Sequence, residues 1–294
     1  MAALSRELLA EIRRIEIVTR RLVTEQMAGQ YHSVFKGRGM AFDEVRPYTP
    51  GDDPRVIDWN VTARTGQPHI KTFTEERELT VLLVVDMSGS MGFGTARDEK
   101  RVVAAKLSAL MAFSAIKNGD RVGLVAFTDT VERYVPPKKG RKHVLRLIDE
   151  ILTLEGSGQG TDIGAAMEFV GRVARRKAIV FLISDFLDEG YQRPLHVAAR
   201  RHDLIPMTVE DPAELELPDL GLLMLEDAET GALMALDTGD ASVRKGYADR
   251  QAQARQARDS DLRRYRVSPI RVSTDARDFA GPLVDYFRLR ARRG

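Results

Sequence analysis

One short stretch of the sequence carries the residue types of a metal site. Asp86, Ser88 and Ser90 follow the apolar run of residues 79–85, so they place one carboxylate and two hydroxyls on a single loop at the end of a predicted strand. Carboxylate and hydroxyl oxygens are hard ligands, and hard divalent cations such as Mg²⁺ prefer them. The stretch therefore predicts part of a magnesium site.

Two distant segments offer ligands that would complete this site. Asp185 ends a second apolar run, residues 179–185, and Thr161 opens a predicted helix after the glycine-rich residues 156–160. The carboxyl ends of parallel strands lie at one edge of a sheet, where ligands commonly bind. We therefore expect one cation to be bound by five residues, namely Asp86, Ser88, Ser90, Thr161 and Asp185.

These ligands leave the charge of the cation incompletely neutralised, because two are carboxylates and three are neutral hydroxyls. Mg²⁺ prefers about six oxygens in octahedral geometry, so a free position would attract a carboxylate from outside. We therefore expect the metal to bind an acidic side chain of a protein partner. Mn²⁺ and Ca²⁺ fit the same oxygens, and the sequence does not choose among the three cations.

The chain from residue 77 onward alternates strand-like and helical stretches. We predict strands at residues 79–86, 121–127, 178–185, 204–209 and 270–273, and helices near residues 98–117, 141–152, 161–176 and 194–201. We also predict a β-hairpin at residues 222–236 and C-terminal helices at residues 240–265 and 279–292. Near-continuous Val, Ile and Leu strands are typical of a parallel sheet that is covered on both faces. The alternation predicts an α/β fold with a doubly wound, mainly parallel sheet.

The first 76 residues differ from this pattern. Residues 1–28 predict an amphipathic helix that packs on another element. Residues 29–76 are rich in Gly, Pro and aromatic side chains and predict a small β-rich arm, with short strands at residues 57–61 and 70–73. We expect this arm to pack on the main domain, residues 77–294.

A charged cluster in the arm predicts a structural clamp, in which arginine side chains bind carboxylates and hold the arm on the main domain. Its members are Arg46, Asp52, Asp53, Arg55, Asp58 and Arg64. We expect Trp59, the only tryptophan, to anchor the same interface. A catalytic role for the cluster and an exposed partner surface at Trp59 are the alternatives.

Composition excludes several other classes of protein. The 294 residues contain no cysteine, which excludes disulfides, thiolate zinc sites and cysteine nucleophiles. The 45 Lys and Arg residues nearly balance the 43 Asp and Glu residues, so no overall field favours nucleic acid. No apolar run approaches the roughly 20 residues that cross a bilayer, and residues 1–27 do not resemble a signal peptide. We expect a cytoplasmic protein without membrane insertion.

The five predicted ligands resemble a known pattern. They are similar to the metal ion-dependent adhesion site of von Willebrand factor type A domains. Asp86, Ser88 and Ser90 match its D-x-S-x-S loop, Thr161 matches its lone threonine and Asp185 matches its distal aspartate. The resemblance implies a von Willebrand factor A-like fold whose Mg²⁺ site is adhesive.

The flanking residues resemble a narrower bacterial family, domain of unknown function fifty-eight. The matching stretches are residues 37–46, 48–53, 55–59, 62–64, 201–203, 211–214 and 217–221. This resemblance implies a cytosolic protein whose relatives are linked to MoxR-type AAA+ ATPases in chaperone-like assembly or metal-centre maturation. We therefore expect a metal-dependent protein-binding module or adaptor, with a MoxR-type AAA+ ATPase or its client as the partner.

Three alternatives to a binding module stay open. Asp and Ser at strand ends often cap loops without binding a metal. A structural scaffold with a vestigial metal site is a second alternative. A Mg²⁺-dependent hydrolase would need a base or nucleophile beside the metal, but Asp162 is the only evident extra carboxylate and no lysine or histidine is positioned there. We therefore do not expect an enzyme, and we expect Phe93, Gly94 and Asp162 to form the rim that a partner contacts.

Overall fold

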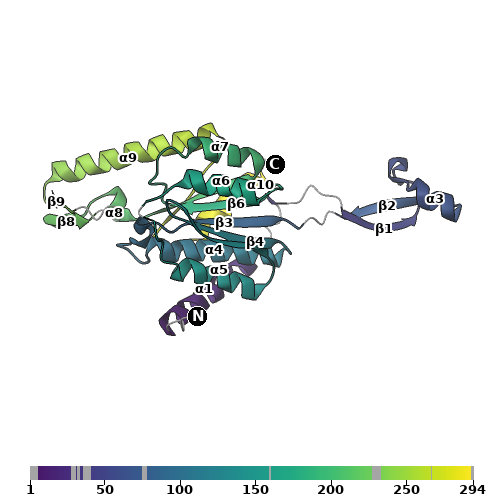
Figure 1. The fold of residues 1–294 in the computed structure, drawn as a ribbon, viewed down its shortest axis with the longest axis horizontal. Coiled ribbons are helices and arrows are strands. Elements are labelled where there is room, and N and C mark those ends of the chain that lie inside the picture. Colours follow the sequence, from purple (N-terminus) through teal and green to yellow (C-terminus); the bar gives the residue numbers. More distant parts are fainter. Residues whose placement is uncertain are drawn as a thin grey trace. The chain divides into compact units, whose positions relative to one another are not determined.

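The computed structural model describes residues 6–27, 31, 34–35, 41–74, 78–158, 160–226, 233–265 and 267–292. The chain forms two compact units. The smaller unit is Phe35–Leu79, and the larger unit consists of the residues before and after it (Figure 1).

The larger unit is built on a six-stranded sheet with the strand order β10-β7-β6-β3-β4-β5. Its strands are β3 (Thr80–Asp86), β4 (Arg121–Phe127), β5 (Val131–Lys138), β6 (Ile179–Ser184), β7 (Asp203–Glu210) and β10 (Ile270–Ser273). Every pair of neighbours is parallel except β4 and β5, which are antiparallel. The predicted α/β fold with a mainly parallel sheet is therefore confirmed.

Helices cover both faces of this sheet, with α6 (Ile163–Val173) and α7 (Gln192–Arg201) on one side and α4 (Lys100–Lys117) and α5 (Arg141–Thr153) on the other (Figure 1). The central strand β3 is buried from Val81 to Asp86, which explains its unbroken apolar run. Alternate residues of the strands, such as Leu82 and Val84, pack against α6 and α7 in one apolar cluster.

The remaining elements of the larger unit are α1 (Arg6–Leu22) with a π-helical turn (Val23–Met27), a 3₁₀ turn (Gly89–Gly92), α8 (Pro212–Leu215), β8 (Leu222–Glu226), β9 (Leu233–Asp237), α9 (Ala241–Arg264) and α10 (Gly281–Ala291). Strands β8 and β9 pair as an antiparallel hairpin. No helix among the described residues has the length and apolar character needed to cross a membrane.

Helix α1 packs on α4 and α5. Ile12 and Ile15 are buried, and Glu16 forms a forked ion pair with Arg141 of α5, in which Nη2 lies 2.9 Å from Oε2. The amphipathic pattern of this segment thus has a defined partner face.

The Glu16 pair makes part of the stability depend on pH. The hydrogen bonds from Arg141 lower the pKa of Glu16 below its ordinary value. A carboxyl with a lowered pKa stabilises the fold above its ordinary pKa and loses that contribution as the pH falls. We expect Glu16→Gln to lower the thermal unfolding midpoint at neutral pH. The difference from the wild type should shrink on acidification; a difference that grows with acid would contradict the assignment.

The smaller unit contains an antiparallel pair, β1 (Ala41–Pro47) and β2 (His69–Thr74), a 3₁₀ turn at Pro54–Val56 and helix α3 (Trp59–Thr65). The predicted strand at residues 57–61 is wrong. Asp58 caps a helix there by accepting hydrogen bonds from the amides of Asn60 and Val61, so the chain turns helical at Trp59. Whether this unit packs on the main domain stays a prediction.

Two residues of the predicted clamp pair with each other inside this unit. Arg46 binds Asp52 through two hydrogen bonds of 2.9 and 2.7 Å, which hold the pKa of Asp52 well below its ordinary value. Asp53 and Asp58 instead cap helical turns, and Asp58 pairs with Lys71 at 3.2 Å.

The hold of this cluster and of Trp59 on the main domain stays a prediction, and Arg55, Arg64 and Trp59 are described within the smaller unit alone. The side chains of Arg55 and Arg64 make no hydrogen bond or ion pair within the described part of this unit. Trp59 exposes 70% of its surface. Within the described part of this unit, Arg46 and Asp52 form the arginine–carboxylate pair of the cluster.

Candidate functional site

The two predicted aspartates emerge at the same edge of the sheet. Asp86 is the last residue of β3, and Asp185 directly follows β6, which pairs with β3 in parallel. Asp86 is fully buried and Asp185 is 3% exposed. Two carboxylates are therefore enclosed side by side at the carboxyl end of the central strands.

The loop after β3 connects these aspartates through its serines. The amide of Ser88 donates a hydrogen bond to Asp86 Oδ1 at 2.9 Å, and the hydroxyls of Ser88 and Ser90 lie 3.1 Å apart. The Ser90 hydroxyl donates to Asp185 Oδ2 at 2.8 Å, although the two residues are 95 positions apart in the chain. Four of the five predicted ligands, Asp86, Ser88, Ser90 and Asp185, are thus brought together.

Thr161 lies at this edge as well, on the loop that leads into α6. The following residue, Asp162, donates its amide to the carbonyl of Thr128 at 2.9 Å and caps α6 by accepting from the amide of Ala165 at 2.7 Å. The same loop passes close to the strand end, because a Cβ on Gly156 would lie 2.8 Å from the carbonyl oxygen of Met87. The structure therefore places the Thr161 loop beside the residue that follows Asp86.

The second carboxylate oxygen of Asp86 is held by Ser184. The Ser184 hydroxyl donates to Asp86 Oδ2 at 2.6 Å and accepts from the amide of Phe186 at 2.9 Å. Burial raises the pKa of Asp86, and the charge of Asp185 adds to this effect, so the pKa reaches about 6 even though Ser184 and Ser88 donate to it. Phe186 has φ of 60°, a left-handed conformation that is uncommon for a residue other than glycine. The turn after β6 therefore holds Ser184 in place to donate to Asp86.

A buried lysine completes the cluster, and the sequence-based statement that no lysine is positioned here is wrong. Lys100, the first residue of α4, is fully buried, and its Nζ donates to Asp185 Oδ2 at 2.7 Å and to Glu214 of α8. Burial disfavours its charge, but Asp185 and Glu214 outweigh that effect and raise the pKa of Lys100. The ammonium therefore stays charged.

One feature of the sequence points to this lysine. A cation at the first position of a helix meets the positive end of the helix dipole and normally destabilises the helix. Lys100 begins a helix whose interior is almost wholly buried, so it requires a carboxylate partner. The sequence does not say which carboxylates these are.

Helix α9 and the end of β7 brace the same edge from outside. Arg258 donates to the backbone carbonyl of Asp185 at 3.0 Å and to the side chain of Glu210 at 2.5 Å. Asp211 accepts from the Thr95 hydroxyl and amide and from the Thr274 hydroxyl. These bonds fix the segment that carries Glu214.

The three predicted rim residues have different environments. Phe93 is 39% exposed, and its ring centroid lies 5.9 Å from Lys100 Nζ. Asp162 is exposed. A Cβ on Gly94 would lie 2.6 Å from Glu99 Cα, so this glycine allows two backbone segments to approach closely.

The donor set fits a hard cation only if hydroxyls take part. Among the described residues, no group of three or more His, Cys, Asp and Glu side chains is arranged to hold a metal ion. The Asp86 carboxylate and the Ser88 and Ser90 hydroxyls supply hard oxygens at one place, whereas one oxygen of Asp185 is already shared by Ser90 and Lys100. A cation here would therefore have mostly neutral direct ligands.

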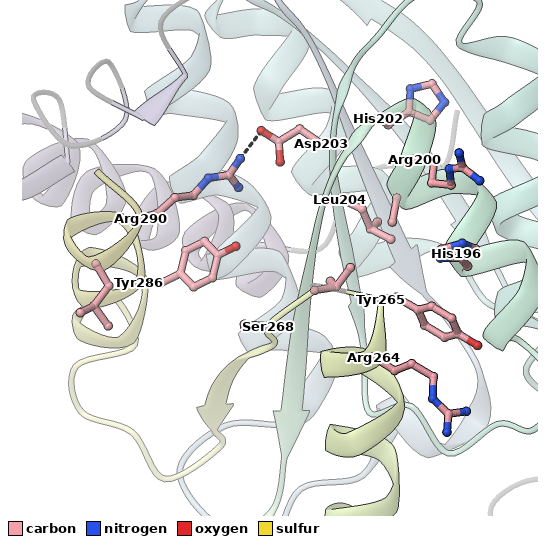
Figure 2. Close-up of a pocket in the computed structure, with 13 residues that line it drawn as sticks. His196, Arg200, His202, Asp203, Leu204, Arg264, Tyr265, Ser268, Tyr286 and Arg290 are labelled. Atoms are coloured by element: carbon pink, nitrogen blue, oxygen red, sulfur yellow. Dashed lines mark hydrogen bonds and ion pairs between the residues drawn. The ribbon is translucent and has the colours of Figure 1, made fainter. Parts of the chain in front are cut away.

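A separate cleft of about 750 Å³ lies at the opposite edge of the sheet, near the start of β7. Arg200 of α7, Arg264 at the end of α9 and Arg290 of α10 line it from three separate walls, as Figure 2 shows. Arg290 is paired with Asp203 at 2.5 Å.

Comparison with known proteins identifies relatives along nearly the whole chain. Uncharacterized protein Rv1480 from Mycobacterium tuberculosis is 34% identical over 289 residues, which cover 97% of this chain and 90% of the relative. Uncharacterized protein YeaD from Bacillus subtilis is 25% identical over 182 residues, covering 62% of this chain and 43% of the relative.

Solved structures with a related arrangement are more distant. BatB from Bacteroides thetaiotaomicron, a conserved hypothetical protein, is 17% identical, covers 74% of this chain and 100% of its own, and has a TM-score of 0.49. The SpRpn10 VWA domain is 10% identical, with coverages of 71% and 95% and a TM-score of 0.41. The family model described as "Protein of unknown function DUF58" matches residues 44–257. Together with the relatives at 34% identity, this match shows that the chain belongs to the DUF58 family.

Proposed function

We propose that this protein is a metal-dependent protein-binding module. In this proposal Asp86, Ser88, Ser90 and Thr161 hold Mg²⁺, with Asp185 bound directly or through water, and the metal binds an acidic side chain of a partner. Mn²⁺ or Ca²⁺ would fit the same oxygens. The proposal extends to a cytoplasmic adaptor that works with a MoxR-type AAA+ ATPase or its client, as the resemblance of the flanking residues implies.

The observation that carries the proposal is the bond between Ser90 and Asp185. It is 2.8 Å long and joins the loop after β3 to the end of β6, so the oxygens of Asp86, Ser88 and Ser90 converge with a second carboxylate. Buried carboxylates that lie together are costly unless a cation compensates them, because like charges repel and their hydration is lost. Lys100 pairs with Asp185 and Glu214, so the proposed metal would compensate Asp86.

The position of Lys100 supports an adhesive rather than a self-sufficient metal site. Its ammonium already pairs with Asp185. Asp86 is therefore the carboxylate that the proposed ligand loop itself offers to the metal. A divalent cation on Asp86 and two serine hydroxyls would keep most of its charge, and the carboxylate of a partner would balance it. The chemistry that the metal supplies is Lewis-acid attraction for that carboxylate.

The proposal predicts that loss of one ligand abolishes metal binding. Titration of the wild-type chain with Mn²⁺, followed by electron paramagnetic resonance, should show one bound ion, whereas Asp86→Asn should bind at least about 100-fold more weakly because it loses the charged ligand. Asp188→Asn, which changes a carboxylate that serves α6 instead, should bind like the wild type. Circular dichroism should show that both variants fold.

The partner is tested separately with a purified MoxR-type ATPase. Immobilised wild-type protein should retain it in Mg²⁺ and release it on addition of a chelator, and Asp86→Asn should not retain it. If the wild type binds the metal but does not retain the ATPase, the proposed partner is wrong while the metal site stands. Absence of metal binding in the wild type would instead favour the scaffold with a vestigial site.

A Mg²⁺-dependent hydrolase is the second candidate, because Lys100 supplies the positioned lysine that the sequence did not reveal. Its raised pKa keeps it protonated, so it would stabilise charge rather than act as a base. Metal-dependent release of phosphate from a phosphate ester, lost in Asp86→Asn, would favour this candidate over the binding module.

A further inference from the structure

Lys100 carries a charge in a place where charge is costly. Its side chain is fully buried, and it sits at the first residue of α4, where the helix dipole is positive. A buried charge is retained only when partners compensate it. Asp185 and Glu214 are these partners. The lysine therefore belongs to the acid cluster, which consists of Asp86, Asp185 and Glu214, rather than to the helix surface.

The same carboxylate oxygen serves the lysine and the proposed ligand loop. Asp185 Oδ2 accepts from Lys100 Nζ at 2.7 Å and from Ser90 Oγ at 2.8 Å. A cation bound by Ser90 would therefore be separated from the ammonium by little more than one carboxylate. Because like charges repel strongly where water is excluded, the ammonium opposes that cation.

The charge balance of the cluster supports this opposition. Asp86, Asp185 and Glu214 carry three negative charges when ionised, and Lys100 carries one positive charge. The ammonium cancels one of these charges, so the cluster attracts a cation bound beside Asp86 less strongly than it would without the lysine. Without the ammonium, three negative charges would face the same cation, and its binding would be stronger.

We infer that Lys100 is an internal counterion that weakens metal binding at this site. Its ammonium compensates Asp185 and Glu214 in the absence of a cation and keeps the affinity for the cation low. The inference rests on the proposed metal site and adds its regulation. A weakly held metal gains most from a carboxylate supplied from outside, so binding of the metal and of an acidic partner would reinforce each other.

The test compares two lysines of the same helix. Lys106 also forms a 2.7 Å ion pair, with Asp98, and the two residues line a pocket together with residues of α1. We expect Lys100→Met to bind Mn²⁺ at least about tenfold more tightly than the wild type, since a repulsive charge is removed. Lys106→Met should leave the affinity unchanged, and Lys100→Arg, which keeps the charge, should stay close to the wild type.

A stability measurement separates this role from a purely structural one. Without metal, Lys100→Met should unfold at lower denaturant concentration, because Asp185 and Glu214 lose their counterion. Saturating Mg²⁺ should raise the unfolding midpoint of this variant by more than that of the wild type. A lysine that merely positions the loop predicts the opposite, namely weaker metal binding and no extra rescue.

A second variant guards against failure of Lys100→Met to fold. Glu214→Gln removes a negative charge and leaves the ammonium to Asp185 alone, so Mn²⁺ should bind more weakly than in the wild type. Equal or weaker binding by Lys100→Met, or unchanged binding by Glu214→Gln, would overturn the inference while the metal site stands. Absence of Mn²⁺ binding in both the wild type and Lys100→Met would overturn the inference and the proposed function together.

Discussion

Replacing Asp185 with alanine is expected to lower the free energy of unfolding by about 3 kcal/mol, the lower end of the range for breaking a buried ion pair. The Lys100 ammonium would lose its 2.7 Å partner and keep only Glu214. The Ser90 hydroxyl and the Leu187 amide would lose their acceptor in the same change. Chemical denaturation of the metal-free protein measures this loss.

Two controls sharpen this expectation. Asp185→Asn keeps a carbonyl oxygen that accepts from Ser90 and Lys100, so it should cost less than alanine. Glu189→Ala removes an exposed carboxylate close in sequence and should leave stability nearly unchanged. If Asp185→Ala were as stable as Glu189→Ala, the buried pair with Lys100 would not contribute to the fold.

The second large effect is expected for Ser184→Ala. This change leaves the Asp86 Oδ2 acceptor and the Phe186 amide without a partner, and both are buried. Unsatisfied buried groups cost about 1–3 kcal/mol each, so the free energy of unfolding should fall by about 2–6 kcal/mol. The left-handed backbone at Phe186 loses its support at the same time.

Ser108 of α4 offers a matched control for this change. It is also a fully buried serine, but its hydroxyl has no hydrogen-bond partner among the described residues. Ser108→Ala should therefore be neutral or slightly stabilising in the same denaturation experiment. Equal losses for the two serine variants would show that burial of the hydroxyl, and not its bonds to Asp86 and Phe186, decides the cost.

The sheet was predictable where the chain is buried on both faces. Residues 81–86 and 179–184 have no polar alternation, because both sides of their strands face helices. Strand β5 was not predicted, since it contains Pro136 and Pro137, which argue against a strand away from a sheet edge. Helix α3 was missed because the capping role of Asp58 outweighs the local strand pattern.

The acid cluster was predictable only in part, and the reason is sequence distance. Asp86, Ser88 and Ser90 share one loop, and a parallel sheet dictates that Asp185 ends at the same edge. Lys100 meets Asp185 and Glu214 across 85 and 114 positions of the chain. Local spacing does not show which carboxylates meet the lysine, because that contact depends on where α4 and α8 pack.

The two prolines of β5 have a consequence for how copies of the protein meet. Of two consecutive strand residues, one directs its backbone nitrogen away from the neighbouring strand, and a proline nitrogen has no hydrogen to offer there. The outer side of β5 is therefore a poor template for a further strand, and the opposite border, β10, spans only Ile270–Ser273. Edge-to-edge pairing of this sheet with the sheet of another molecule, which can start fibril formation, is thus disfavoured at both edge strands.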